Sequence, residues 1–320
     1  MFFSVIIPVY NRPKEILDLL QSLSHQSFND FEVLIIEDGS VLNCRKEVDA
    51  FKEVLNIKYF FIQNVGQGFA RNYGIEKAKG SYFIFFDSDC IIPENYLRTL
   101  KKSISERKLD AHGGPDAASD DFSSAQKAMD FAMTSWLTTG GIRGKMKDPS
   151  KYQARGFNMG FSRKVFEKVG GFADPNKAED IEISIRIKKA GFKLELVSDA
   201  FVYHKRKNDF KSFIKQGFSF GRNRVNVSRF HSDAIKLVHF MPFLFLLFLF
   251  SMLFTFWLIP ELFGFQALIL AIWSLSIFAM ASIQYGQVSI GSLALVFSIF
   301  QLTAYGLGLA YELSIKWLKG

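Results

Sequence analysis

Cysteine, histidine and a basic N-terminal leader are the features that this sequence has least of. Its 320 residues include two cysteines, Cys44 and Cys90, and five histidines. Two cysteines without metal-ligand spacing exclude a disulfide framework and a cysteine-based zinc site. The apolar N-terminal run has no basic leader and is interrupted by Pro8, so it predicts a strand and no signal peptide. We therefore expect the N-terminal domain to stay in the cytosol.

Charge is almost absent from one long stretch near the C-terminus. Between Lys236 and Glu312, Glu261 is the one charged side chain. A helix that crosses a bilayer needs roughly 20 apolar residues, so the stretch predicts about three transmembrane helices. The predicted spans are 237–259, 262–283 and 288–311, followed by a short tail at 312–320. Spans with so few ionisable groups exclude a transporter or a channel.

Positive charge concentrates immediately before the first predicted span. The net charge is +8, and lysine and arginine gather in residues 205–236. Such a segment marks the cytoplasmic side of a membrane and attracts anionic lipid headgroups, so we expect membrane lipids and no nucleic acid as partners. The sequence thus predicts a cytosolic domain at 1–208, a juxtamembrane segment at 209–236, and a multi-pass anchor in the inner membrane.

The juxtamembrane segment has helical periodicity. Apolar residues recur at three- and four-residue spacing from Phe210 to Phe218, with basic residues between them. This pattern predicts a basic amphipathic helix. The helix fits equally well on the membrane surface and against the core of the N-terminal domain.

The first 110 residues alternate between short apolar runs and helical patterns. Asn11 is positioned to cap a helix that begins at Pro13, a favoured first-turn residue. This alternation predicts an α/β domain with a doubly wound, mostly parallel sheet, in which ligands bind beyond the carboxyl ends of the strands. The predicted strands are 3–9, 31–36, 58–62 and 82–86.

Two later segments are harder to interpret. Residues 110–150 are rich in glycine and polar side chains and predict a long connection that shapes an acceptor pocket. In residues 178–190, isoleucines alternate from Ile181 to Ile187, which favours a strand. The acidic start of that segment and the glycine at Gly191 favour a helix, which is our prediction.

The strongest local candidate for a site is Asp87-Ser88-Asp89, which follows the fourth predicted strand. Mg²⁺ and Mn²⁺ bind one or two carboxylates together with substrate phosphates, and they neutralise a departing diphosphate. An isolated Asp-x-Asp triplet is usually a solvated turn. At the end of a buried strand, a site and a turn are equally good interpretations.

Other polar residues allow both structural and functional interpretations. Asp38, at the end of the second strand, can cap the amides of its own turn or accept hydrogen bonds from a base or ribose. Glu179-Asp180 can stabilise a helix N-terminus or supply a general base. His204 can be a metal ligand, although by itself it is better interpreted as structural.

A glycine-bearing turn at Gly66 is similar to a dinucleotide-binding fingerprint. Its sixth position is Arg71, where that fingerprint needs a small residue for close packing, and the turn follows the third predicted strand instead of the first. These departures argue against a dehydrogenase.

Six motifs that occur in order resemble the family 2 glycosyltransferases, which have the GT-A (nucleotide-diphospho-sugar transferase) fold. The resemblance covers residues 2–205, and the apolar tail is similar to that of bacterial members with C-terminal spans. The motifs are Ser4–Asn11, Glu37–Ser40, Ala70–Asn72, Asp87–Asp89, Gly170–Phe172 and Glu179-Asp180.

The resemblance implies a set of donor contacts. Pro8 and Tyr10 would lie near the nucleotide base, and Asp38 would contact the base or ribose. Arg71 would contact the nucleotide or its phosphates, and Asp87 the ribose. The implied donor is a UDP-, GDP- or dTDP-sugar.

The resemblance also implies the chemical groups. Asp89 would bind the divalent metal, Mg²⁺ or Mn²⁺, with His204 completing the metal site. Asp180 would be the catalytic base of an inverting transfer, and Glu179 would belong to the nucleotide-sugar site.

The acceptor would be a lipid-linked or cell-surface glycan, because the tail holds the site against the bilayer. Processive synthases of this family carry Gln-x-x-Arg-Trp after the base, which this sequence lacks, so we predict single addition. A processive polysaccharide synthase and a non-catalytic nucleotide-binding membrane scaffold are the alternatives. Product length and turnover assays distinguish the three.

Overall fold

The chain divides into two compact units. Unit 1 contains residues 1–117 and 146–205, and unit 2 contains residues 118–145 and 206–320. The computed structural model describes residues 2–117, 122–140, 148–173, 178–204 and 209–318.

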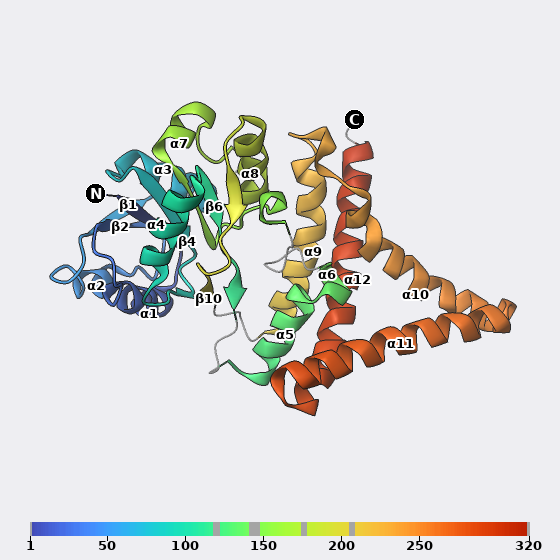
Figure 1. Cartoon of the computed structure of the whole chain (residues 1–320). Helices are drawn as coiled ribbons and strands as arrows, with labels where there is room; N and C mark the ends of the chain where they lie inside the picture. The colour runs from blue at the N-terminus through green and yellow to red at the C-terminus, as the bar shows by residue number, and fades with distance from the viewer. Residues whose placement is uncertain (1, 118–121, 141–147, 174–177, 205–208, 319–320) are drawn as a thin grey trace. The chain divides into compact units, whose positions relative to one another are not determined.

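Unit 1 is built on a seven-stranded sheet (Figure 1). Its order is β3-β2-β1-β4-β8-β6-β9, in which the first four strands are mutually parallel and β8 runs antiparallel to both of its neighbours. The strands are β1 (Phe3–Val9), β2 (Phe31–Asp38), β3 (Ile57–Ile62), β4 (Tyr82–Phe86), β6 (Ala111–Gly113), β8 (Asn158–Ser162) and β9 (Leu194–Leu196). The prediction of a mostly parallel α/β sheet is confirmed.

Helices cover both faces of this sheet. Along β1, Val5 and Ile7 pack into one core cluster, whereas Ile6 packs into the other. A strand covered on both faces needs a continuous apolar sequence, which explains the uninterrupted runs. One face is covered by α1 (Pro13–Ser24), α2 (Arg45–Asp49) and α4 (Tyr96–Arg107), and the other by α3 (Gln67–Lys77), α7 (Arg163–Val169) and α8 (Glu179–Lys189).

The ambiguous segment at 178–190 forms helix α8, as predicted. Ile183 and Ile187, four residues apart, are both fully buried in the core cluster. Ala178 at the helix start has a φ of 61°, a left-handed conformation that is uncommon outside glycine.

A second, three-stranded sheet lies in unit 1, with the order β5-β10-β7. Its strands are β5 (Cys90–Ile91), β7 (Asp116–Ala117) and β10 (Val202–His204). The antiparallel register pairs the backbone of His204 with that of Cys90. This sheet therefore brings β10 beside the residue that follows Asp89.

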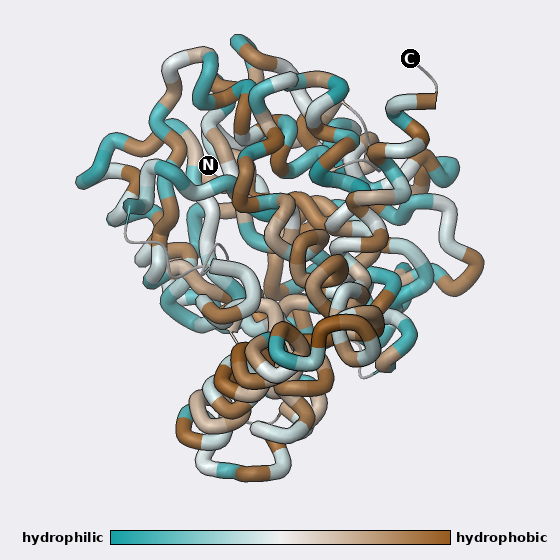
Figure 2. The backbone as a smooth tube through the Cα atoms, turned by 90° about the vertical axis from the view of Figure 1, so that its right-hand side faces the viewer, coloured by the Kyte–Doolittle hydropathy of each residue, from teal (hydrophilic) through white to brown (hydrophobic). Residues whose placement is uncertain are grey.

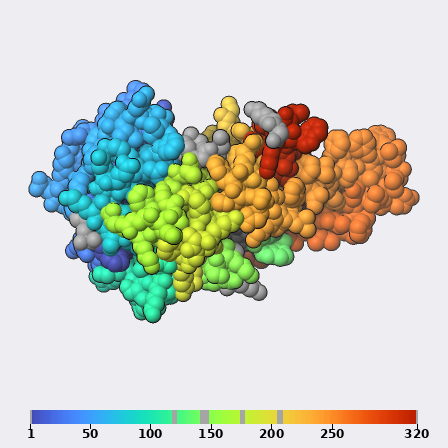
Figure 3. All heavy atoms as spheres, turned by 90° about the horizontal axis from the view of Figure 1, so that it is seen from above, coloured from blue at the N-terminus to red at the C-terminus, as the bar shows by residue number. Residues whose placement is uncertain are grey.

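Three long apolar helices end the chain in unit 2. They are α10 (Met241–Leu258), α11 (Pro260–Tyr285) and α12 (Val288–Leu318), each long and apolar enough to cross a membrane. Brown, hydrophobic residues are frequent in the lower part of Figure 2, and the atoms of these helices are among the orange to red spheres of Figure 3. Leu253 and Leu275 expose 65% and 66% of their surface. Apolar surface of this extent is typical of helices that face lipid.

Part of the predicted long connection is helical. Helices α5 (Ser124–Thr134) and α6 (Trp136–Thr139) lie in unit 2, so the expectation of an irregular connection was wrong for residues 124–139. A capping box between Ser123 and Gln126 starts α5, and Met129 and Met133 pack in one core cluster with Phe297 of α12. Residues 118–121 and 141–147 of that connection lie outside the described residues.

The predicted amphipathic helix is α9 (Phe210–Val227), and it packs along α12. We expected this helix on the membrane surface or against the core of the N-terminal domain, and neither prediction included α12 as its packing partner. Close approach depends on glycines, because a Cβ at Gly221 would lie 2.1 Å from the Tyr305 carbonyl oxygen, and one at Gly308 would lie 2.0 Å from that of Phe218. Glycine removes this steric barrier between two helix backbones.

Candidate active site

The predicted site residues of unit 1 gather at one edge of the sheet. Asp38 ends β2, and Asp87 and Asp89 follow β4 directly. The strand order 3-2-1-4 reverses direction between β1 and β4, and ligands of doubly wound sheets bind at such a reversal. The acidic triplet therefore lies at the carboxyl edge where this topology places a ligand.

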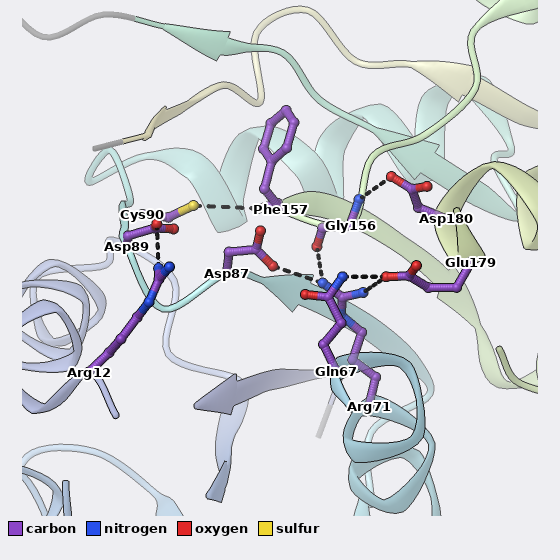
Figure 4. A network of polar contacts seen from close by, with 10 residues as sticks. All are labelled: Arg12, Gln67, Arg71, Asp87, Asp89, Cys90, Gly156, Phe157, Glu179 and Asp180. Atoms are coloured by element: carbon purple, nitrogen blue, oxygen red, sulfur yellow. Dashed lines mark hydrogen bonds and ion pairs between the residues drawn. The ribbon is translucent and has the colours of Figure 1, made fainter. Parts of the chain in front are cut away.

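Arg71 is the centre of a buried ionic cluster (Figure 4). Its Nη1 donates to Glu179 Oε1 at 3.0 Å, and its Nη2 donates to Asp87 Oδ1 at 2.8 Å. Nη2 also lies 3.3 Å from the Gly156 carbonyl oxygen. A Cβ at Gly156 would lie 2.7 Å from the guanidinium, so glycine leaves room for it. The cluster links the end of β4 to the first turn of α8.

Two of the sequence motifs meet around Arg71. Asn72 Nδ2 donates to the Phe172 carbonyl at 2.9 Å, and Asn72 Oδ1 accepts from the Phe172 amide at 2.8 Å. The Arg71 guanidinium lies over the Phe172 ring, 5.5 Å from its centroid. A Cβ at Gly171 would lie 2.2 Å from Asn72 Oδ1. These contacts explain why an Ala-Arg-Asn motif and a distant Gly-Gly-Phe motif occur in one chain.

The adjacent carboxylates Glu179 and Asp180 have different environments. Glu179 is buried and also accepts from Gln67 Nε2 at 2.6 Å. Burial, together with the charge of Asp180, raises the pKa of Glu179 to about 7, and Arg71 opposes that rise. Asp180 is half-buried, and its Oδ2 accepts from the Gly156 amide at 3.2 Å. Burial thus favours the neutral form of Glu179.

Asp38 accepts hydrogen bonds from backbone amides, as its structural interpretation predicts. Its Oδ1 accepts from the Val65 amide at 2.7 Å, and its Oδ2 accepts from the Gly66 amide at 2.9 Å. These bonds fix the loop that enters α3. A carboxylate has about four lone-pair sites, so a base or ribose contact stays a prediction. At the neighbouring end of β1, Pro8 is buried and Tyr10 is 53% exposed.

Asp89 already holds a cationic partner. Arg12 Nη1 forms a short ion pair with Asp89 Oδ2, and the two side chains are 29% and 12% exposed. A carboxylate that attracts a cation at this strand end fits the ligand preference of Mg²⁺ and Mn²⁺. Within the part of the chain that the structure describes, no three histidine, cysteine or acidic side chains gather as a metal cluster. The side chain of His204 lies outside that part, so its metal role stays a prediction.

Sequence reasoning missed three residues of this edge, namely Arg12, Gln67 and Gly156. Arg12 follows Asn11, which we predicted as the cap of the helix that begins at Pro13, and this cap prediction was wrong. Asn11 does not cap the helix: its side chain accepts from the amides of Val41 and Leu42, both at 2.9 Å. Arg12 occupies the cap position without a side-chain cap bond. A basic residue directly after a first strand was the available signal.

Known proteins are similar to this chain in sequence and in fold. The family model for glycosyl transferase family 2 matches residues 4–170. The chain belongs to glycosyl transferase family 2. An uncharacterized glycosyltransferase of Rickettsia bellii is 39% identical over 106 residues, which are 33% of this chain and 15% of that protein. The chain thus spans a small part of that relative's length.

Solved structures confirm the predicted GT-A fold. The mannosyltransferase PcManGT from Pyrobaculum calidifontis, in complex with GDP-Man and Mn²⁺, has a TM-score of 0.63 at 18% identity, covering 98% of this chain and 87% of that one. TarS 1–349 of Staphylococcus aureus in complex with UDP-GlcNAc has a TM-score of 0.50 at 22% identity, covering 71% of this chain and 67% of that one. Family and fold are therefore as the sequence motifs predicted.

Proposed function

We propose that the protein transfers a sugar from a nucleotide-sugar donor to a lipid-linked or cell-surface glycan by a single, inverting addition. The ionic cluster of Asp87, Arg71 and Glu179 beside Asp180 carries this proposal. It aligns the family motifs at the carboxyl edge of a doubly wound sheet, where a nucleotide-sugar would bind. The relatives bind UDP-GlcNAc in one case and GDP-Man with Mn²⁺ in another, which supports a UDP-, GDP- or dTDP-sugar here.

In this proposal the donor lies across the ends of β1, β2 and β4. Asp38, with Pro8 and Tyr10, would bind the base or ribose, and Asp87 would bind the ribose. Because Arg71 is fully buried between two carboxylates, it would hold Asp87 in position for the donor. Glu179 would keep Arg71 in place, which is a positioning role within the nucleotide-sugar site.

Asp180 would accept the proton of the acceptor hydroxyl as that oxygen attacks the anomeric carbon from the face opposite the diphosphate. Its half-buried carboxylate, held by the Gly156 amide, suits a general base that must reach a substrate. Asp89, with His204, would hold Mg²⁺ or Mn²⁺. A divalent cation held there would neutralise charge on the departing diphosphate.

The acceptor and the location follow from unit 2. Three long apolar helices support a multi-pass membrane protein, and the basic α9 supports a cytoplasmic position for unit 1. An active site tethered to a bilayer would encounter lipid-linked acceptors preferentially. Acceptor, linkage and compartment are parts of the proposal.

Substitution of Asp180 tests the proposed chemistry. D180N keeps the side-chain volume and removes the base, so we expect turnover to fall about 100-fold or more while donor affinity stays within about threefold. Release of nucleoside diphosphate is measured with a panel of sugar nucleotides, Mn²⁺ and membrane extract, and donor binding by calorimetry. D49N, at an exposed carboxylate of α2, is the matched control.

Loss of donor binding in D180N would assign this residue to binding and refute its role as base. No diphosphate release by the wild-type protein with any donor would refute the proposed function and favour a non-catalytic scaffold. Product length separates single addition from processive synthesis.

A further inference from the structure

Arg12 lies at the point where the strand order reverses. It follows β1, whereas its partner Asp89 follows β4, so their ion pair spans the two neighbouring strand ends. In Figure 4, Arg12 and Arg71 approach the acidic triplet from opposite sides, one toward Asp89 and the other toward Asp87. Each carboxylate of the triplet therefore has its own guanidinium.

The backbone around Arg12 is held on both sides. Asn11 has a φ of 54°, and its amide donates to Ser40 Oγ at 2.7 Å. The Asn11 side chain accepts from two further amides of the same loop. Pro13 then fixes the first residue of α1. The direction in which Arg12 leaves the backbone is therefore set by the loop after β2.

The two arginines differ in how firmly they are bound. The Arg71 side chain is 1% exposed and contacts two carboxylates, whereas the Arg12 side chain is 29% exposed. Breaking the Arg71 contacts would leave charge buried without a partner, which is costly. Arg12 can turn toward water or toward another anion at small cost, because a partly exposed ion pair contributes little.

We propose that Arg12 is the resident counter-cation of Asp89 in the donor-free protein and exchanges with the divalent metal. When a donor diphosphate and a divalent metal bind together, Asp89 would exchange Arg12 for the metal, and the released Arg12 guanidinium would bind a diphosphate oxygen. A guanidinium and a divalent cation on one carboxylate repel each other, and a guanidinium binds phosphate well. This inference rests on the proposed function, because it needs a diphosphate donor.

The proposed exchange predicts that the binding of metal and the binding of nucleotide strengthen each other. Without nucleotide, Arg12 competes with metal for Asp89. With nucleotide, the diphosphate offers Arg12 a new partner, and both ligands bind more tightly. Arg12 therefore makes the protein bind metal and donor together instead of metal alone.

The test measures the binding of Mn²⁺ to the full-length protein in detergent by electron paramagnetic resonance, with and without UDP or GDP. In R12Q, we expect the affinity for Mn²⁺ without nucleotide to rise roughly two- to fivefold, and the gain in Mn²⁺ affinity on adding nucleotide to shrink by a similar factor. R107Q is the matched control, because Arg107 pairs with Glu195 at similar exposure, 34% and 17%. D89N in the R12Q background should abolish the added Mn²⁺ binding.

Unchanged Mn²⁺ affinity and coupling in R12Q would overturn the inference while leaving the proposed function intact. Failure of the wild-type protein to bind Mn²⁺ with either nucleotide would instead count against the proposed metal site. If R12Q does not fold, R12K provides the test. Lysine binds phosphate as a point charge and lacks the planar fork of a guanidinium. In R12K we therefore expect nucleotide to raise the Mn²⁺ affinity by less than it does in the wild type, but still measurably. The proposed exchange would be overturned if R12K keeps the wild-type gain in Mn²⁺ affinity on adding nucleotide and its Mn²⁺ binding no longer depends on Asp89.

Discussion

At a pH well above about 7, where Glu179 is ionised in the wild type, replacing Arg71 with methionine should destabilise unit 1 by about 3 kcal/mol or more, because it removes the counter-charge of a buried carboxylate. The wild-type guanidinium contacts Glu179 Oε1 at 3.0 Å and Asp87 Oδ1 at 2.8 Å. The Glu179 side chain is 6% exposed and that of Asp87 is 31% exposed. Water screens Asp87, so Glu179 accounts for most of the penalty.

The penalty in R71M should depend on pH. The pKa of Glu179 is already raised from 4.5 to about 7 by burial and by Asp180, against the opposing effect of Arg71. Removing Arg71 raises that pKa further. A carboxyl with a raised folded-state pKa favours folding below its unfolded pKa and loses that contribution as pH rises toward the folded value. Below about pH 7 the buried Glu179 is protonated in both folded proteins, so the difference in stability between wild type and R71M should be nearly constant there and should grow above about pH 7, where Glu179 ionises in the wild type alone.

The two cysteines provide an assay specific to unit 1. Cys44 and Cys90 are both buried, both unpaired and both in unit 1, and the chain has no other cysteine. Thiol labelling as a function of urea therefore measures the free energy of opening of unit 1 in the full-length protein. It is insensitive to the apolar helices of unit 2.

The double variant R71M/E179M decides whether charge is the cause. Replacing both partners with apolar residues of similar volume removes the uncompensated charge, so the double variant should be more stable than R71M by about 1–3 kcal/mol at a pH well above about 7. If the double variant is no more stable than R71M, the loss comes from packing around Phe172 and the reasoning is refuted.

Two glycine substitutions test the close contacts of the fold. G171A should destabilise unit 1 by about 1–3 kcal/mol in the same thiol assay, because the new methyl group would lie 2.2 Å from Asn72 Oδ1; wild-type stability would disprove that contact. In unit 2, G221A should destabilise the packing of α9 on α12 by a similar amount, measured by tryptophan fluorescence in urea. Gly264 has nothing within 4 Å of a Cβ, so G264A is its control, and equal stability of the two variants would contradict the prediction.

The amino-acid sequence by itself determined the first four strands, β1 to β4, and the candidate acids. Continuous apolar runs such as 3–9 and 82–86 are stable only when both faces of a strand are buried, which requires helices on each side. Local pattern also placed Asp87 and Asp89 at a strand end, because the run of apolar residues stops there. The order of the six motifs then identified the family.

Tertiary structure alone decided which charges meet. Arg71 reaches Glu179 across 108 positions and Arg12 reaches Asp89 across 77, and no local pattern records such pairs. They depend on strand order, which brings the ends of β1 and β4 together and carries α8 to the same edge. The family resemblance implied that Arg71 contacts the donor, which stays a prediction, and the fold shows that Arg71 is buried between two carboxylates. Burial is a property of everything packed around a residue, so only the assembled sheet could show it.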